Sequence, residues 1–264
     1  MEEENTEKKY VLVTGASSGI GKEISIELAK QGYSLVIIGR DKKRLQDLKD
    51  ILVKEHEVDI VAISADLVKK DIARTLNEGL KKKNIRIFGL VNNAGFGIYG
   101  MFDEKSVKDY DEMIELNINA LTQITYEFMD DLKKTEGFIM NISSIAGLVP
   151  VPYMAVYGAT KSYVTSFTEA LAQEYPNLRI YSVHPGFVET GFQKRAGQEE
   201  WIKTKTLQSS QKVAEEAVAA LDSSDIIVYT DRGMKIKMFF SRFLPRKKVY
   251  SIMEKSMRLE TKKD

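Results

Sequence analysis

The sequence predicts an α/β protein whose single domain is a doubly wound parallel β-sheet with helices on both faces. Strand-like apolar runs alternate with amphipathic helical stretches along most of the chain, which makes the helices crossovers between parallel strands. Residues 35–38 form an uninterrupted apolar run, as expected for a strand that is buried on both faces. Right-handed crossovers then wind the chain onto both faces of the sheet.

The first half supplies four strands and three helices. Ile20, Ile24 and Leu28 recur every four residues, and Leu45, Leu48 and Leu52 share one stripe, so both stretches are helical. Strands are expected over residues 10–13, 35–38, 60–63 and 87–91, with helices over residues 20–30, 41–53 and 68–83.

The second half continues the alternation. Strands are expected over residues 138–142, 178–183 and 226–229, with helices over residues 106–133, 154–174 and 213–221. A longer and more polar stretch runs from residue 187 to about residue 210. We expect residues 1–230 to form the dinucleotide-binding and catalytic domain and residues 231–264 to form a basic, amphipathic, helical extension.

Composition excludes several classes of function. The 264 residues contain 39 Lys and Arg and 38 Asp and Glu, and this formal net charge of +1 argues against a dedicated nucleic-acid binder. The chain has no cysteine, which excludes disulfides, thiolate metal sites and a cysteine nucleophile. With only two histidines, His56 and His184, a histidine-based metal cluster is not expected.

The chain shows no targeting signal that would place it in a membrane. Its first nine residues are acidic and polar, unlike a secretory signal. The longest uncharged run, residues 137–160, contains Asn, Ser, Thr and Pro and does not resemble a membrane span. We therefore expect a soluble cytoplasmic protein.

A glycine-rich turn joins the first expected strand to the first expected helix. Gly15, Gly19 and Gly21 have the spacing G-x-x-x-G-x-G. They allow a tight turn, close approach to a pyrophosphate and close helix packing, and the helix N-terminus attracts phosphate. Such glycines can also serve backbone conformation alone. We expect a Rossmann-like nucleotide site that also includes Ser17, Ser18 and Ile20.

This spacing resembles the short, non-extended branch of the short-chain dehydrogenase/reductase family, and further motifs carry the resemblance from about residue 10 to residue 229. Tyr157-x-x-x-Lys161 matches the family's Y-x-x-x-K, and Ser144 lies 13 residues earlier. N-N-A-G follows the fourth strand, and P-G-F-V-E-T matches P-G-x-V-x-T. The resemblance implies cofactor contacts from Asp66, Leu67, Asn93, Ala94, Gly95, Tyr157, Lys161, Pro185, Gly186, Val188 and Thr190.

The candidate catalytic residues are Asn117, Ser144, Tyr157 and Lys161. Tyr157 and Lys161 lie four residues apart on one helical face, so the ammonium is expected to lower the phenol's pKa and let Tyr157 act as acid or base. Ser144 can orient a carbonyl. The resemblance implies that Lys161 holds the ribose and that Asn117 supports a proton relay. A Tyr/Lys pair without further motifs more often reflects a packed tyrosine and a solvent-exposed lysine. We expect His184 to be a structural histidine.

Arg40 indicates the type of cofactor. NAD-specific sites place an acid after the second strand to bind the ribose 2′-OH, but this position holds Gly39, followed by Arg40. A small residue leaves room for a 2′-phosphate, which Arg recognises with its planar fork. Asp41 fits better as a helix cap. Ser18 stands where the family carries a second basic residue, so NADP(H) is expected with one phosphate contact fewer.

An apolar or aromatic character marks the residues expected around the substrate. The resemblance implies that the stretch from residue 187 to about residue 210 forms a mobile lid, which contains Phe187, Phe192, Trp201 and Ile202. Phe96, Ile98, Tyr99, Met101, Pro150, Pro152, Tyr153 and Met154 are candidates for the mouth. We expect an apolar ketone, aldehyde or secondary alcohol, although many of these residues could simply pack in the core.

Two classes of function remain open. The first is an NADPH-dependent oxidoreductase, and the second is a non-catalytic NADP-binding sensor or assembly protein on the same fold. The presence of all four candidate catalytic residues favours the enzyme. The resemblance also implies a homodimer or homotetramer that pairs the helices at residues 106–133 and 154–174.

The segment 231–264 differs in composition from the rest of the chain. It contains eleven basic and four acidic residues, a net charge of +7. Aromatic and aliphatic residues are interleaved with the basic ones, and Pro245 is expected to split the segment into two helices. One interpretation is peripheral contact with an anionic membrane. The other is that the apolar residues pack on the protein or on a dimer partner.

Overall fold

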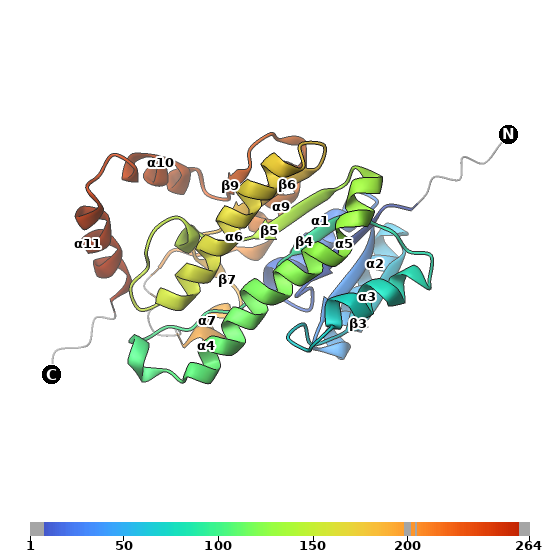
Figure 1. Cartoon of the computed structure of the whole chain (residues 1–264), viewed down its shortest axis with the longest axis horizontal. Helices are drawn as coiled ribbons and strands as arrows, with labels where there is room; N and C mark the ends of the chain where they lie inside the picture. Colours follow the sequence, from blue (N-terminus) through green and yellow to red (C-terminus); the bar gives the residue numbers. More distant parts are fainter. Residues whose placement is uncertain (1–7, 198–201, 204, 259–264) are drawn as a thin grey trace.

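The computed structural model describes residues 8–197, 202–203 and 205–258. Its centre is a seven-stranded parallel sheet in the order β3-β2-β1-β4-β5-β6-β9 (Figure 1). The strands are β1 Tyr10–Thr14, β2 Ser34–Gly39, β3 Ile60–Ser64, β4 Ile87–Asn92, β5 Phe138–Ile142, β6 Arg179–His184 and β9 Ile227–Tyr229. The predicted single-domain, doubly wound sheet is therefore confirmed, and every predicted strand is present.

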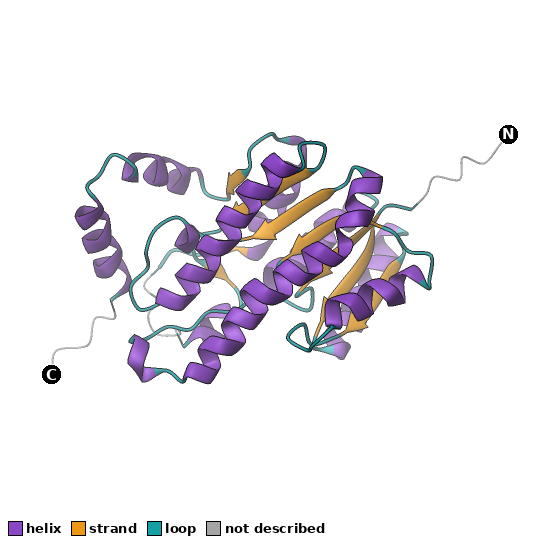
Figure 2. Ribbon diagram, in the orientation of Figure 1, coloured by secondary structure: helices purple, strands orange, loops and turns teal. Residues whose placement is uncertain are grey.

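Helices cover both faces of this sheet (Figure 2). One face packs against α1 Gly19–Lys30, α2 Lys42–His56 and α9 Ser210–Ala219. The other face packs against α3 Ile72–Lys81, α5 Leu121–Thr135 and α6 Ala155–Glu174.

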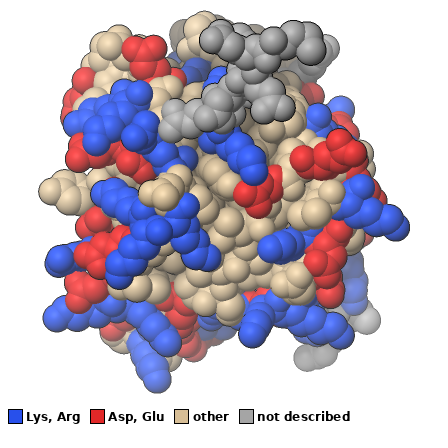
Figure 3. Space-filling view, turned by 90° about the vertical axis from the view of Figure 1, so that its right-hand side faces the viewer, with Lys and Arg blue, Asp and Glu red and all other residues tan. Residues whose placement is uncertain are grey.

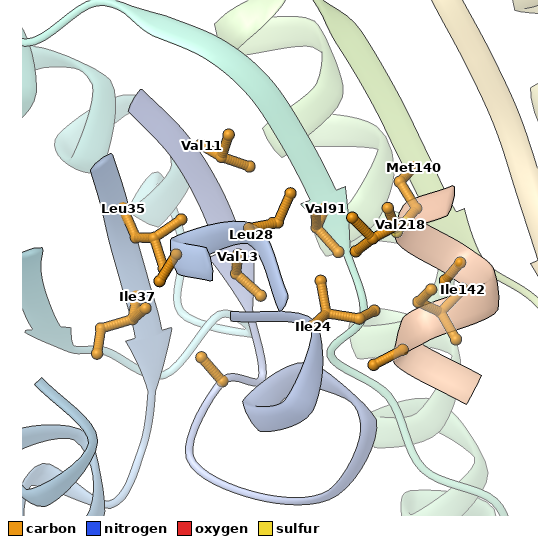
Figure 4. Close-up of a cluster of buried hydrophobic side chains, with 14 of the residues drawn as sticks. Val11, Val13, Ile24, Leu28, Leu35, Ile37, Val91, Met140, Ile142 and Val218 are labelled. Carbon is orange, nitrogen blue, oxygen red and sulfur yellow. The ribbon is translucent and has the colours of Figure 1, made fainter. Parts of the chain in front are cut away.

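Alternation along each strand divides the core into two clusters. Val11 and Val13 of β1 point to the α1 side, where they meet Ile24 and other buried side chains (Figure 4). Tyr10 and Leu12 of the same strand point to the α5 side. Because successive side chains of a strand face opposite ways, a sheet buried on both faces needs apolar residues at every position.

The strand order creates a crevice at one edge of the sheet. The chain runs from β1 outward to β2 and β3, and then returns to place β4 on the other side of β1. Loops that follow β1 and β4 therefore diverge, which opens a ligand crevice at the carboxyl ends of the strands.

One long helix was expected over residues 106–133, but the structure divides this region into three parts. These are α4 Val107–Ile114, a π-helical segment Glu115–Ala120 and α5. The helix expected from residue 68 begins only at Ile72, because Asp71 has a left-handed backbone conformation with φ of 57° that interrupts helical geometry.

The polar stretch after β6 contains short elements. They are β7 Val188–Glu189, α7 Phe192–Ala196 and β8 Gln208–Ser209, and β7 pairs with β8 in a small second sheet. Trp201 lies outside the described residues, so its expected place in a lid stays a prediction.

The C-terminal extension forms two helices that are separated by Pro245, as expected. Asp231 caps α10 Arg232–Ser241 by accepting a hydrogen bond from the Met234 amide at 2.8 Å, and α11 Arg246–Met257 follows Pro245. Both helices lie at one end of the molecule, and α2 and α3 lie toward the other end (Figure 1). The domain boundary at residue 230 stays a prediction.

The described surface carries both signs of charge. On the face at the right of Figure 1, Lys and Arg are interspersed with Asp and Glu (Figure 3). Among the described residues, none of the helices has the length and apolar character that a membrane crossing requires. That part of the chain also holds no group of three or more His, Cys, Asp or Glu side chains arranged to bind a metal.

Candidate active site

A cleft of about 570 Å³ lies at the carboxyl ends of the strands. It brings together residues that are far apart along the chain, from Gly15 to Met257. All the predicted site residues line the cleft except Gly21 and Asn117. Those that line it are Gly15, Ser17, Ser18, Gly19, Ile20, Arg40, Asp66, Leu67, Asn93, Ala94, Gly95, Ser144, Tyr157, Lys161, Pro185, Gly186, Val188 and Thr190.

The glycine turn is held in shape by Asn93. Gly15 has a φ of +67°, which favours glycine, and a Cβ on Gly21 would lie 2.3 Å from Asn93 Nδ2 and 2.5 Å from the Gly15 carbonyl oxygen. Asn93 Nδ2 donates to the carbonyl oxygens of Thr14 at 2.9 Å and Gly15 at 3.2 Å. Gly21 therefore packs the helix against the turn, and Asn93 joins this turn to the end of β4.

Asn117 lies behind the cleft in the π-helical segment and is almost fully buried. Its Nδ2 donates to the Phe96 carbonyl at 2.9 Å and to Thr160 Oγ1 at 3.1 Å, while its Oδ1 accepts from the Phe96 amide at 3.1 Å. π-Helical turns often occur at functional sites because they displace side chains and leave backbone groups available. The observed contacts make Asn117 a clamp between α6 and the loop after β4.

Ser144, Tyr157 and Lys161 converge at the floor of the cleft. Ser144 follows β5, and its Oγ accepts from the Ala146 amide at 3.2 Å. Tyr157 and Lys161 lie one turn apart on α6, and both are buried. Lys161 Nζ donates to the Ile142 carbonyl at 2.7 Å and lies 5.9 Å from the centroid of the Tyr157 ring.

The expected lowering of the Tyr157 pKa is wrong for this structure. Burial raises the pKa of Tyr157 from 10.0 to about 12, and a hydrogen bond with Ser144 opposes that shift. Burial also lowers the pKa of Lys161 from 10.5 to about 8. Lys161 Nζ donates to the Ile142 carbonyl, and burial is the largest influence on the pKa of the phenol. Tyr157 is therefore a neutral phenol, able to donate a proton.

His184 supports Ser144 from behind. Its Nδ1 lies 3.0 Å from the Ser144 carbonyl oxygen, and its Nε2 lies 2.8 Å from Ser182 Oγ. A carbonyl oxygen can only accept, so Nδ1 carries the proton and Nε2 accepts from Ser182. The expectation of a satisfied structural histidine is confirmed.

Cationic side chains gather at the other end of the cleft. A Cβ on Gly39 would lie 3.1 Å from Ser17 Oγ, which leaves little room for an acidic side chain there. Asp41 caps α2 through the Arg44 amide at 3.0 Å, as expected. Arg40, Arg44 and Arg195 all line the cleft. Burial, followed by the nearby charge of Arg40, lowers the pKa of Arg195.

Arg195 is a site residue that sequence reasoning missed. It projects from α7, with its guanidinium carbon 3.8 Å from the centroid of the Phe96 ring and Nη2 3.5 Å from Glu112 Oε1. No motif marks this position. The contacts connect the segment after β6 to the opposite wall of the cleft.

The apolar end of the cleft has some unexpected contributors. Phe96, Met154, Phe187 and Phe192 line it as expected, whereas Met101, Pro150 and Pro152 do not. Ile98, Tyr99, Tyr153 and Ile202 belong to the hydrophobic cluster beside it. Met253 and Met257 of α11 also line the cleft, and the spacing of four between these two methionines was the only signal for them.

Comparisons with known proteins agree with this arrangement. A family model described as short chain dehydrogenase matches residues 9–201. The 11-beta-hydroxysteroid dehydrogenase-like 4A protein of Arabidopsis thaliana is 30% identical over 250 residues, which cover 92% of this chain and 83% of that protein. The human very-long-chain 3-oxoacyl-CoA reductase is 35% identical over 195 residues, which cover 70% of this chain but only 61% of the reductase.

A solved structure extends the match to the fold. The short-chain dehydrogenase from Sphingobium yanoikuyae in complex with NADPH has a TM-score of 0.81 and 27% identity, covering 97% of this chain and 99% of that one. Together with the motifs converging in one cleft, these matches show that the chain belongs to the short-chain dehydrogenase family and is an oxidoreductase.

Proposed function

We propose that the protein is an NADP(H)-dependent oxidoreductase that interconverts an apolar ketone or aldehyde and the corresponding alcohol. The observation that carries this proposal is the convergence of Ser144, Tyr157 and Lys161 in one cleft that has a cationic end and an apolar end. A neutral phenol beside a serine hydroxyl, under an apolar wall, suits proton transfer to a carbonyl oxygen.

The residues present fit a dinucleotide. The positive φ of Gly15 and Gly19 and the tight packing at Gly21 shape a backbone cradle at the N-terminus of α1, where phosphate is stabilised. Arg40 and Arg44 line the cleft and offer planar cationic forks that suit a 2′-phosphate, and Gly39 stands where a 2′-hydroxyl would call for an acid. The NADPH complex of the Sphingobium relative supports the same cofactor. Bound NADPH would supply the hydride.

The chain's own residues manage the proton and the carbonyl. Ser144 orients the carbonyl oxygen by donating its hydroxyl proton, and Tyr157 delivers a proton to that oxygen as negative charge develops there. The raised pKa of Tyr157 keeps this proton in place before reaction. Lys161 then stabilises the phenolate, and Asn117 holds α6 in register with the loop after β4, as a positioning residue.

The class of substrate follows from the apolar end of the cleft. Phe96, Met154, Phe192, Met253 and Met257 offer aromatic and thioether surface, which suits a bulky apolar group and disfavours sugars. The names of the relatives, which refer to hydroxysteroids and very-long-chain acyl groups, support the same class.

A non-catalytic NADP-binding protein is the second candidate, but it would not require a buried proton donor or a desolvated lysine. We further propose that the protein works in the cytoplasm as a homodimer or homotetramer.

A panel of carbonyl compounds tests the proposal, with turnover followed by loss of NADPH absorbance. Bulky apolar ketones or aldehydes are expected to be reduced, and NADPH is expected to be preferred over NADH. Tyr157→Phe should abolish turnover while NADPH still binds, because only the proton donor is lost. Tyr163→Phe, six residues further along α6, is the matched control and should remain active. Full activity of Tyr157→Phe would contradict the assignment.

A further inference from the structure

Helix α10 presents its apolar side chains to solvent. Ile236, Phe239 and Phe240 of this helix, and Phe243 in the turn that follows, are each more than half exposed, up to 73% for Phe243. They are spaced at i, i+3, i+4 and i+7, so they form one stripe along the helix. We call these four residues the α10 stripe. Contiguous exposed apolar surface of this kind marks an interaction site.

The stripe is exposed although α10 is packed on the protein. Met234 and Met238 lie on the opposite side of the helix and are partly buried, and the Met234 Cε lies 4.0 Å from where a Cβ on Gly186 would be. Helix α11 directs Met253 and Met257 to the cleft and Lys247 and Lys248 to solvent, and of its apolar residues Ile252 is 55% exposed. The continuous outward stripe belongs to α10, whose methionine side faces the protein.

Basic residues flank the stripe. Lys235 and Arg242 lie along one side of it and Lys237 lies along the other, as the helical period places them, and all three are exposed. Arg246, Lys247 and Lys248 follow in the first turn of α11, where the helix dipole disfavours positive charge. Residues 232–253 contain seven basic residues and no acidic residue. Lys235 Nζ lies 3.5 Å from Asp225 Oδ2, whereas the three charges in the first turn of α11 oppose the helix dipole, so contact with a negatively charged surface would stabilise them.

The chemistry of this surface selects its partner. A second copy related by a twofold axis would bring like charges together, which is unfavourable. Single-stranded nucleic acid needs open aromatic faces for stacking, but Phe239 packs edge-on against Phe240 at 81° and against Phe243 at 66°. Aromatic and aliphatic side chains bordered by Lys and Arg match the boundary between acyl chains and anionic headgroups.

We propose that the α10 stripe docks the protein onto the surface of an anionic phospholipid membrane. The phenylalanines enter the region below the headgroups, while Lys235, Lys237 and the basic first turn of α11 contact lipid phosphates. The contact is peripheral, since none of the described helices can span a bilayer. The same extension lends Met253 and Met257 to the cleft, so docking places the apolar end of the cleft at the membrane side.

Vesicle sedimentation of the full-length protein tests this proposal without depending on turnover. The protein should pellet with vesicles that contain phosphatidylglycerol, remain in solution with phosphatidylcholine vesicles, and dissociate as salt is raised. Phe239→Ser, Phe240→Ser and Phe243→Ser combined should weaken binding by about tenfold or more, which corresponds to ~1.4 kcal/mol. An unchanged circular dichroism spectrum and melting temperature will show that this variant is folded.

A matched pair of charge variants separates this surface from net charge. Combining Lys237→Glu, Lys247→Glu and Lys248→Glu should abolish binding to anionic vesicles. The control, which combines Lys81→Glu, Lys82→Glu and Lys83→Glu at the exposed end of α3, makes the same change of charge and should bind like the wild type.

The proposal would be overturned if the wild-type protein failed to pellet with anionic vesicles at low salt, or if both charge variants lost binding equally. The wild type could also fail to bind vesicles while the phenylalanine variant changed from oligomer to monomer. The last would assign the stripe to self-association. Tight binding of single-stranded RNA in place of vesicles would likewise assign it to nucleic acid.

Discussion

The imidazole of His184 donates a hydrogen bond from Nδ1 to the backbone carbonyl of Ser144 at 3.0 Å. Since Ser182 Oγ lies 2.8 Å from Nε2, both ring nitrogens are satisfied by the neutral form. Burial lowers the pKa of His184 from 6.5 to about 4. The position of the serine that orients the carbonyl therefore depends on a histidine that stays uncharged.

This arrangement predicts a loss of stability in mild acid. The unfolded chain takes up a proton at His184 near pH 6.5, but the folded chain does so only near pH 4, so the free energy of unfolding decreases as pH falls through this window. The contribution of His184 is about 3 kcal/mol. Urea unfolding at pH 7 and pH 4.5 should show a smaller decrease in His184→Asn than in the wild type. His56→Gln, at the other histidine, should behave like the wild type.

Lys161 predicts an alkaline limit to activity. Its ammonium is charged below its pKa of about 8 and neutral above it, so the stabilisation that it gives to cofactor and phenolate is lost as pH rises. The value of kcat/KM for NADPH, which reports the free enzyme, should fall about tenfold per pH unit above pH 8. Lys161→Arg keeps the charge, so whatever activity it retains should not fall in this range. If kcat/KM began to fall at the same pH in the wild type and in Lys161→Arg, the result would contradict this prediction.

Arg40 predicts the preference for cofactor. Arg40→Ala should weaken NADPH binding by about tenfold or more and leave NADH binding nearly unchanged, because one charge-assisted phosphate contact contributes about 1.5–3 kcal/mol. Calorimetry of both cofactors measures this. Lys43→Ala removes an exposed charge on α2 that does not line the cleft and should alter neither affinity. NADH binding as tight as NADPH binding in the wild type would refute the preference.

Arg195 predicts how firmly the segment after β6 closes the cleft. Arg195→Met removes the contacts with Phe96 and Glu112, so NADPH should dissociate about three to ten times faster, as expected for one cation–π contact. Stopped-flow fluorescence measures this rate. Lys194→Ala is the control. It removes a neighbouring positive charge on α7, but Lys194 does not line the cleft, so the dissociation rate should stay unchanged. A wild-type rate in Arg195→Met would show that closure does not depend on this side chain.

The exposed outer face of α5 leads us to predict that the protein forms a dimer or tetramer. Tyr126 is 80% exposed there, and α5 and α6 lie beside each other on the same face of the sheet (Figure 1). Light scattering at micromolar concentration should give a dimer or tetramer, and Tyr126→Asp should shift it towards monomer. Ile51→Asp, on the opposite side of the sheet, is the control. A monomer in the wild type would contradict the expected assembly.

Periodicity and motifs predicted most of the fold and the cleft. The apolar run of β1 and the leucine stripe of α2 are visible in the local sequence alone, so these elements were found. The π-helical segment around Asn117 was missed because Met113, Asn117 and Leu121 keep a spacing of four, which an uninterrupted α-helix would also show. Hydropathy spacing alone does not distinguish the two.

Features that depend on distant contacts escaped prediction. The direction of the Tyr157 pKa shift was wrong because the depth of burial and the hydrogen bond from Lys161 to Ile142 are set by tertiary packing. Arg195, Met253 and Met257 reach the cleft from segments without a motif. The cofactor end, whose residues lie in motifs, was therefore predicted better than the substrate end.

The hydrogen bonds from Asn93 to Thr14 and Gly15 also link the stability of the fold to the affinity for its cofactor. Glycine loses more conformational entropy than any other residue when it is fixed, and the turn after β1 and the start of α1 together fix Gly15, Gly19 and Gly21. Asn93 offsets this loss as the chain folds, so the turn is already ordered when a nucleotide arrives. Without the Asn93 side chain, the turn would become ordered only when a nucleotide binds, and the entropic cost of ordering it would reduce the affinity for the nucleotide.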